Sequence, residues 1–145
     1  MEALHYLLMK SHTMLNRRIV SRVMSGGFSP GQPKVLECLS RQEGVDQKTI
    51  ARYCEIEQAT VGGILLRMEQ AGLVERRRKE GNRRSLFVYL TEKGKQAASG
   101  INIIFSEEDC RAEHGLTPEE SEQLKVLLEK LCRSLEMRNE GRWLI

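Results

Sequence analysis

The feature that most constrains this fold is a strongly basic segment lying between two stretches that favour β-strands. The stretches are Leu73–Val74 and Ser85–Leu90, and in the second Leu86, Val88 and Leu90 alternate as in a half-buried strand. A Gly-Asn pair between them favours a turn. We predict a β-hairpin with an anchored stem and a tip, residues 76–84, that carries Arg and Lys side chains into solvent.

Charge is distributed unevenly along the chain. Residues 72–95 hold eight Lys or Arg against three Glu, a local charge of +5 in a chain whose total is +3. Residues 96–145 hold six basic and ten acidic side chains. A basic centre with an acidic tail is expected when one surface meets a polyanion, which favours double-stranded DNA as a partner. The alternative is that the charges only solubilise surface helices.

Composition excludes several other classes. The 145 residues suffice for one domain with helical extensions, and 5% aromatics argue against a stacking platform for single strands. No apolar run approaches the roughly 20 residues that span a bilayer, and the N-terminus lacks a signal-peptide pattern, so we expect a cytoplasmic protein without membrane contact. No phosphate loop, nucleophile elbow or carboxylate pair is present, so we expect neither an enzyme nor a cofactor.

Helix signals surround the hairpin. An apolar stripe runs through residues 2–24, and Gly26–Gly27 ends it. Four further helices are predicted to begin at the capping residues Ser29 (with Pro30 and Gln32), Asp46, Thr91 and Thr117 (with Glu120). Another helix is predicted to begin after a break at Glu55–Ile56 and to end at about Ala71, before Gly72. We therefore predict a mainly α protein with a small β-hairpin wing: a winged helix-turn-helix unit whose second helix enters the major groove.

The long flanking helices need a separate explanation, because their leucine stripes are too apolar for water. Packing against a second copy would bury them and would present two reading helices at half-sites about one turn of DNA apart. We predict that residues 1–25 and 93–145 form a dimerisation region, so that the chain is a homodimer. The alternative is that both termini fold back on their own chain.

From residue 29 to 92 the chain resembles the MarR family of bacterial transcriptional regulators. The motifs that carry the resemblance, in register without a gap, are Phe28–Leu36, Gln47–Ala51, Ala59–Glu69, Gly72–Arg76, Asn82–Ser85 and Leu90–Gly94. The resemblance implies that residues 29–92 form the winged helix-turn-helix DNA-binding domain. It also implies a sequence-specific regulator of a pseudo-palindromic operator, in most such families a repressor. In such families the operator is released when a small-molecule effector binds. The resemblance places the effector site between the first helix, the helix after Ser29 and the start of the helix after Thr91.

The resemblance also assigns DNA-binding residues. Arg84 matches the wing Arg expected in the minor groove, with Arg83 and Ser85 beside it. Gln58 and Thr60 stand in the first turn of the reading helix, where they can reach bases or phosphates, although Thr60 can equally act as a local cap. Lys48 is a backbone-contact candidate. Arg67 either contacts phosphate or pairs within the protein near Glu69, and Arg76 is expected to brace the hairpin stem.

The sequence departs from the family pattern at several positions. Asn82 replaces a usual Asp and removes an ion pair, and Glu55 stands where a turn glycine is common. Glu57 replaces a capping Ser. Gly62–Gly63 are expected on the outward face of the reading helix, where they either let its backbone approach DNA or weaken base readout so that the wing contributes more. We favour the second interpretation, which predicts that alanine at both positions preserves binding.

Cysteine and histidine chemistry offers weaker alternatives. Cys54 and Cys132 each follow an apolar residue by one helical turn, which predicts that both are small buried groups. The other two cysteines are Cys38 and Cys110, and the four together lack the spacing of metal ligands. A redox-responsive regulator acting through a cysteine is one alternative function. A winged-helix module that binds protein, with weakened base readout, is the other. His5, His12 and His114 are too scattered to predict a zinc site.

Overall fold

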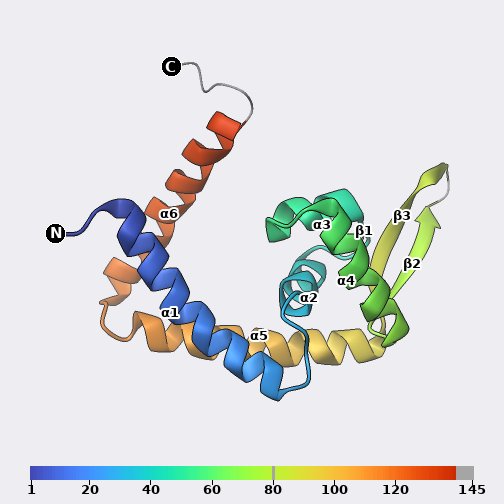
Figure 1. The fold of residues 1–145 in the computed structure, drawn as a ribbon, viewed down its shortest axis with the longest axis horizontal. Coiled ribbons are helices and arrows are strands. Elements are labelled where there is room, and N and C mark those ends of the chain that lie inside the picture. The colour runs from blue at the N-terminus through green and yellow to red at the C-terminus, as the bar shows by residue number, and fades with distance from the viewer. Residues whose placement is uncertain (80, 140–145) are drawn as a thin grey trace. The chain divides into compact units, whose positions relative to one another are not determined.

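The computed structural model describes residues 1–79 and 81–139; for residues 82–84 and 137–139 it describes the backbone only. The chain divides into two compact units, Met1–Glu108 and Asp109–Ile145, which we describe separately. The first unit contains five helices and a three-stranded antiparallel sheet among the described residues (Figure 1). Its elements are α1 (Leu4–Ser25), α2 (Gln32–Arg41), β1 (Val45–Asp46), α3 (Gln47–Cys54), α4 (Gln58–Gln70), β2 (Val74–Lys79), β3 (Asn82–Leu90) and most of α5 (Glu92–Glu113). The predicted mainly α fold with a small β wing is confirmed.

The helix boundaries at the centre of the chain follow local capping chemistry. The Asp46 carboxylate accepts a hydrogen bond from the Thr49 backbone N–H at 2.9 Å and so begins α3. Glu55 ends α3 in the left-handed region with φ 54°, and Gly72, with φ 75°, follows α4. Thr91 Oγ1 accepts from the Gly94 N–H at 3.0 Å at the start of α5. These four predictions are confirmed, and Glu55 carries the strain expected of a residue with a Cβ at positive φ.

The predicted start of α2 is wrong. Ser29 does not cap it; its carbonyl accepts from the Gln32 N–H at 3.1 Å in a turn, and the helix begins at Gln32. Pro33 occupies the first turn, where the missing N–H costs nothing. The turn packs so closely on α4 that a Cβ at Gly31 would lie 2.5 Å from Ile64 Cδ1. This contact is between distant segments, so the local sequence does not reveal it.

The predicted division of the hairpin into short strands and a long basic tip is also wrong. The strands extend through the basic segment, so that Arg76 pairs with Val88 and Arg77 with Phe87. The register fits side-chain contacts across the strands: the Arg77 guanidinium lies 4.4 Å from the Tyr89 ring and Lys79 Nζ lies 4.3 Å from the Phe87 ring. Figure 1 shows the base of the hairpin beside the start of α5.

The sheet contains a strand that the sequence did not predict. β1 is two residues long, and its Val45 and Asp46 pair with Val88 and Phe87 of β3, giving the strand order β1-β3-β2. The predicted apolar face of β3 is only partly buried, because Val88 and Leu90 lie in the core while Leu86 is 40% exposed. β1 therefore attaches the start of α3 directly to the hairpin.

The core of the first unit lies where the helices meet the base of the hairpin. Its fully buried apolar side chains include Val23, Val35, Leu36, Leu39, Ile50, Val61, Leu65, Met68, Val88 and Ile101. Cys38 and Cys54 are buried with them, as predicted for Cys54. Cys132, predicted to be buried, is exposed. The core anchors both the second helix of the helix-turn-helix unit and the stem of the wing.

The second unit contains the end of α5 and α6 (Pro118–Asn139). The predicted capping box is confirmed: the Thr117 N–H donates to Glu120 Oε1 at 2.9 Å, and the Glu120 N–H donates to Thr117 Oγ1 at 3.1 Å. Large apolar side chains remain exposed along α6, at Leu124, Val126, Leu127, Leu128 and Leu135. Within the described ranges, no helix combines the length and apolar character that a membrane crossing requires.

Candidate nucleic-acid interface

The first turn of α4 is the exposed end of the helix-turn-helix unit. Gln58, Ala59 and Thr60 are all exposed there. Glu57 occupies the N-cap position, but its side chain accepts no hydrogen bond from the helix. Among the described residues, the N-cap side chain therefore leaves the first backbone N–H groups of α4 uncapped, and the start of a helix carries partial positive charge. This end can bind an acceptor such as a phosphate oxygen or a base edge.

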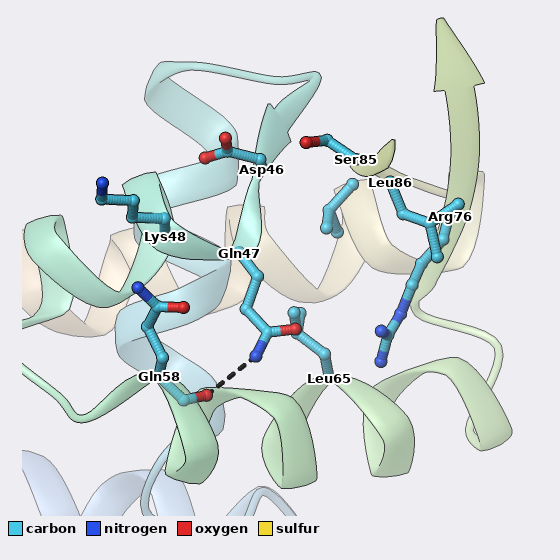
Figure 2. Close-up of a pocket in the computed structure, with 9 residues that line it drawn as sticks. Asp46, Gln47, Lys48, Gln58, Leu65, Arg76, Ser85 and Leu86 are labelled. Atoms are coloured by element: carbon cyan, nitrogen blue, oxygen red, sulfur yellow. Dashed lines mark hydrogen bonds between the residues drawn. The ribbon is translucent and has the colours of Figure 1, made fainter. Parts of the chain in front are cut away.

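A hollow of about 420 Å³ lies between this turn, α3 and the hairpin. It brings three predicted DNA-binding residues to one surface: Lys48 from α3, Gln58 from α4 and Ser85 from β3 (Figure 2). The lining is completed by Asp46, Gln47, Leu65, Arg76, Leu86 and Val88. Two other predicted residues, Thr60 and Arg67, are exposed on α4 but do not line the hollow. The side chains of Arg83 and Arg84 lie outside the described part of the structure.

Arg76 links the hairpin to α4. Its Nε lies 3.6 Å from Glu69 Oε2, at ion-pair distance, and its side chain is 21% exposed. This Nε has no hydrogen-bond partner within the described residues. Glu69 was considered as a partner for Arg67, but the described contacts join it to Arg76 instead. The arrangement fixes the stem of the wing against the last turns of α4.

Two of the basic side chains of β2 are held against the stem by local contacts. Arg77 forms an ion pair with Glu75 and also stacks on Tyr89. The hydrogen bond from Arg77 to Glu75 raises the pKa of Arg77, which therefore stays charged. Lys79 lies over Phe87. These contacts order the positive charges along one strand, where they add to the positive potential of the hairpin.

Asp46 places a negative charge at the edge of the same hollow. Hydrogen bonds from the Thr49 side chain and then its backbone lower the pKa of Asp46, with a smaller contribution from the charge of Lys48. The carboxylate is therefore ionised at neutral pH, and its Oδ1 caps α3.

Gln47 is a residue of this surface that the sequence analysis did not identify. Its Nε2 donates a hydrogen bond to the Gln58 carbonyl at 2.8 Å, joining the starts of α3 and α4 (Figure 2). The predicted outward orientation of Gly62 is wrong, because Gly62 is half-buried next to the same Gln47 amide. Contacts between two helices leave no periodic signal, so only the assembled structure reveals them.

The cysteines and histidines do not form a second site. Cys38 and Cys54 are both buried. The interaction with Cys38, and then burial, raise the pKa of Cys54, while the interaction with Cys54 lowers the pKa of Cys38. Neither thiol is accessible to a solvent oxidant. Across the described ranges, no three His, Cys, Asp or Glu side chains gather where they could hold a metal ion.

Comparison with known proteins gives a consistent result. The MarR family model matches residues 28–86. The Bacillus subtilis protein named HTH-type transcriptional regulator YfiV is 32% identical over 130 residues, covering 90% of this chain and 81% of that protein. The region that the family model matches includes the predicted reading helix and most of the predicted wing.

Solved structures of related proteins share the fold. A MarR family regulator from Listeria monocytogenes, complexed with a 26mer DNA, superposes with a TM-score of 0.86 at 19% identity, covering 93% of this chain and 90% of that one. The Mycobacterium tuberculosis MarR family protein Rv2887, in complex with salicylic acid, gives a TM-score of 0.72 at 26% identity and covers 90% and 97% of the two chains.

Proposed function

This chain belongs to the MarR family of transcriptional regulators, which are not enzymes, and from that premise we propose that it is a homodimeric, sequence-specific repressor. Its operator would be a pseudo-palindromic site on double-stranded DNA. Residues 29–92 would form the DNA-binding domain, and residues 1–25 and 93–145 the dimerisation region. A protein with this function would work in the cytoplasm.

The observation that carries this proposal is the common surface of α3, α4 and the hairpin. Lys48, Gln58 and Ser85 line one hollow there, at the exposed start of a helix. A helix start offers N–H donors to phosphate, and Gln can read an adenine edge in the major groove. We assign Gln58 and Thr60 to base or phosphate contacts in the major groove, and Lys48, Arg67 and Ser85 to the DNA backbone.

The wing supplies the second part of the proposed contact. Arg84 would enter the minor groove, where narrow A·T-rich stretches attract arginine, and Arg83 would contact phosphate. The ordered positive charges of Arg77 and Lys79 on the preceding strand support this assignment. Because many phosphates would be neutralised, the affinity should fall steeply with salt.

Dimerisation is supported by apolar side chains that the single chain leaves in water. Leu4, Leu7 and Met9 of α1 are 61%, 44% and 52% exposed, and α6 carries a further row. Burial of apolar surface stabilises association by about 25 cal/mol for each Å². A two-fold dimer would also present two copies of α4 to two half-sites of one operator.

Regulation by a small molecule would act through the dimer geometry. The relative Rv2887 has been crystallised with salicylic acid, which supports an effector for the present chain as well. An effector that prefers one spacing of the two reading helices would shift the dimer away from the spacing that fits DNA. The bound dimer would block transcription, and release of the operator would permit it; a relative named as a repressor supports that sign.

A gel-shift titration with the region upstream of the protein's own gene tests the proposal. At about 50 mM salt we expect retardation by the dimer, and at about 200 mM salt a loss of affinity of roughly 10³-fold or more, as for proteins with six or more phosphate contacts. A scrambled duplex of equal length is the control. Absence of retardation at both salt concentrations would instead favour the protein-binding module, an alternative suggested by the acidic Glu57 at the start of α4.

A further inference from the structure

The two adjacent glycines of α4 have different surroundings. A Cβ added at Gly62 would lie 3.1 Å from the Nε2 atom of Gln47, closer than an ordinary van der Waals contact. A Cβ added at Gly63 would meet only Arg67 Nη1, at 4.0 Å. Helix propensity favours alanine over glycine at both positions. Only at Gly62 does the structure provide a reason for the missing side chain.

The atom that occupies the space beside Gly62 is the donor of an interhelical hydrogen bond. Gln47 Nε2 donates to the Gln58 carbonyl at 2.8 Å. Gln58 is the first residue of α4, whose N-cap Glu57 provides no side-chain hydrogen bond. A methyl group at Gly62 would require the Gln47 amide to move by a few tenths of an ångström, which would lengthen the bond that attaches the start of α4 to α3.

Gln47 is itself held in place by the sheet. The preceding residue, Asp46, caps α3 through Thr49 and pairs with Phe87 of β3. A continuous series of contacts therefore leads from the wing strand through Asp46 and Gln47 to the first turn of α4. That turn presents Gln58 and Thr60, the side chains assigned to the major groove.

We propose that Gln47 and Gly62 form a lock that fixes the first turn of α4 relative to the wing, and that Gln47 is a positioning residue for operator recognition. This inference rests on the proposed DNA-binding function. Gly62 is required because it leaves room for the Gln47 amide, whereas Gly63 is dispensable. Weak base readout is then not the reason for the glycine at position 62, and the two glycines have separate roles.

Four variants test the lock: Gly62→Ala, its matched control Gly63→Ala, Gln47→Ala and the double variant Gln47→Ala/Gly62→Ala. The affinity of each is measured by fluorescence anisotropy for the operator and for a scrambled duplex, together with the melting temperature. We expect Gly63→Ala to raise the melting temperature and leave operator affinity within about twofold of wild type. Gly62→Ala and Gln47→Ala should each lower operator affinity by about fivefold or more while scrambled-duplex affinity stays constant.

The double variant provides the decisive comparison. If Gly62 serves only to admit the Gln47 amide, alanine at position 62 should cost no further operator affinity once Gln47 is removed. Losses that multiply in the double variant, or equal losses in the two glycine variants, would overturn the lock. If the wild-type protein binds no duplex, the proposed function fails, and the same cycle in melting temperature still tests the lock: additive changes would refute it.

Discussion

Arg18 of α1 and Glu108 of α5 form an ion pair with an Nε–Oε2 distance of 2.7 Å, although Glu108 is only 1% exposed. Arg22 approaches the same carboxylate, with Nη1 lying 3.3 Å from Oε1. The hydrogen bond to Glu108, and then the charge of Glu108, raise the pKa of Arg18, so Arg18 stays charged at neutral pH. Two cations, one helical turn apart on α1, thus attach α1 to α5 within the first unit.

Replacing Glu108 by Gln should destabilise the fold. The substitution keeps the shape but removes the charge that two arginines contact, and hydrogen bonds to charged groups contribute about 1.5–3 kcal/mol. We expect the free energy of unfolding to fall by about 2 kcal/mol in urea denaturation. Glu107→Gln is the matched control, because Glu107 also contacts Arg22 but is 58% exposed. Its expected loss is below about 1 kcal/mol, and equal losses would contradict the importance of the buried carboxylate.

The cap of α3 should make stability depend on pH. Asp46→Ala should cost about 1 kcal/mol, the usual value for a lost N-cap, whereas Asp46→Asn keeps a capping side chain. The folded-state pKa of Asp46 is lowered, so its contribution is present above the unfolded pKa of about 3.9 and is lost as the pH falls through the folded pKa. Denaturation series from about pH 6 to about pH 3 should show the wild-type advantage over Asp46→Asn shrinking as the pH falls. A constant difference would contradict this.

A charge on the apolar row of α6 should separate the dimer. Leu127 is 53% exposed in the single chain, and Leu127→Glu would place a carboxylate in the proposed interface. Light scattering across a concentration series should give the dimer mass for wild type and the monomer mass for this variant. Glu129→Lys changes the charge at an exposed position on the opposite side of α6 and should remain dimeric. A wild-type mass that stays monomeric at every concentration would refute the dimer.

Arg84 is the strongest single assignment of the wing. Arg84→Ala should weaken operator binding by about tenfold or more at moderate salt, because an arginine in a narrow minor groove is held by its negative potential. Arg41→Ala removes one positive charge from the end of α2 and should change affinity by less than about threefold. Circular dichroism and melting temperature should match wild type in both variants. Unchanged affinity of Arg84→Ala would count against the wing assignment.

The parts of the fold that the sequence predicted are those set by neighbours in the chain. The cap at Asp46, the capping box at Thr117 and the left-handed Gly72 each depend on residues within a few positions, and all are confirmed. The start of α2 was misplaced because Gly31 packs against Ile64, a residue of another helix. Interactions within one turn can be predicted from the sequence, whereas contacts between two helices depend on the completed fold.

The same distinction applies to the candidate site. The sequence indicated Lys48, Gln58 and Ser85, and the structure brings them to one hollow. The sequence did not indicate Gln47, whose neighbours Gln58 and Gly62 belong to the next helix. The sequence predicted that Arg76 braces the hairpin stem, but it did not identify Glu69 as the partner of Arg76.

The central claim is that this protein recognises a defined site on double-stranded DNA as a dimer. The most direct test is selection of random duplexes by the purified protein, followed by sequencing of the retained DNA. We predict enrichment of one pseudo-palindromic sequence whose half-sites lie about one helical turn apart, roughly 10 base pairs between centres. Retained DNA with the same sequence distribution as the starting pool would contradict the claim.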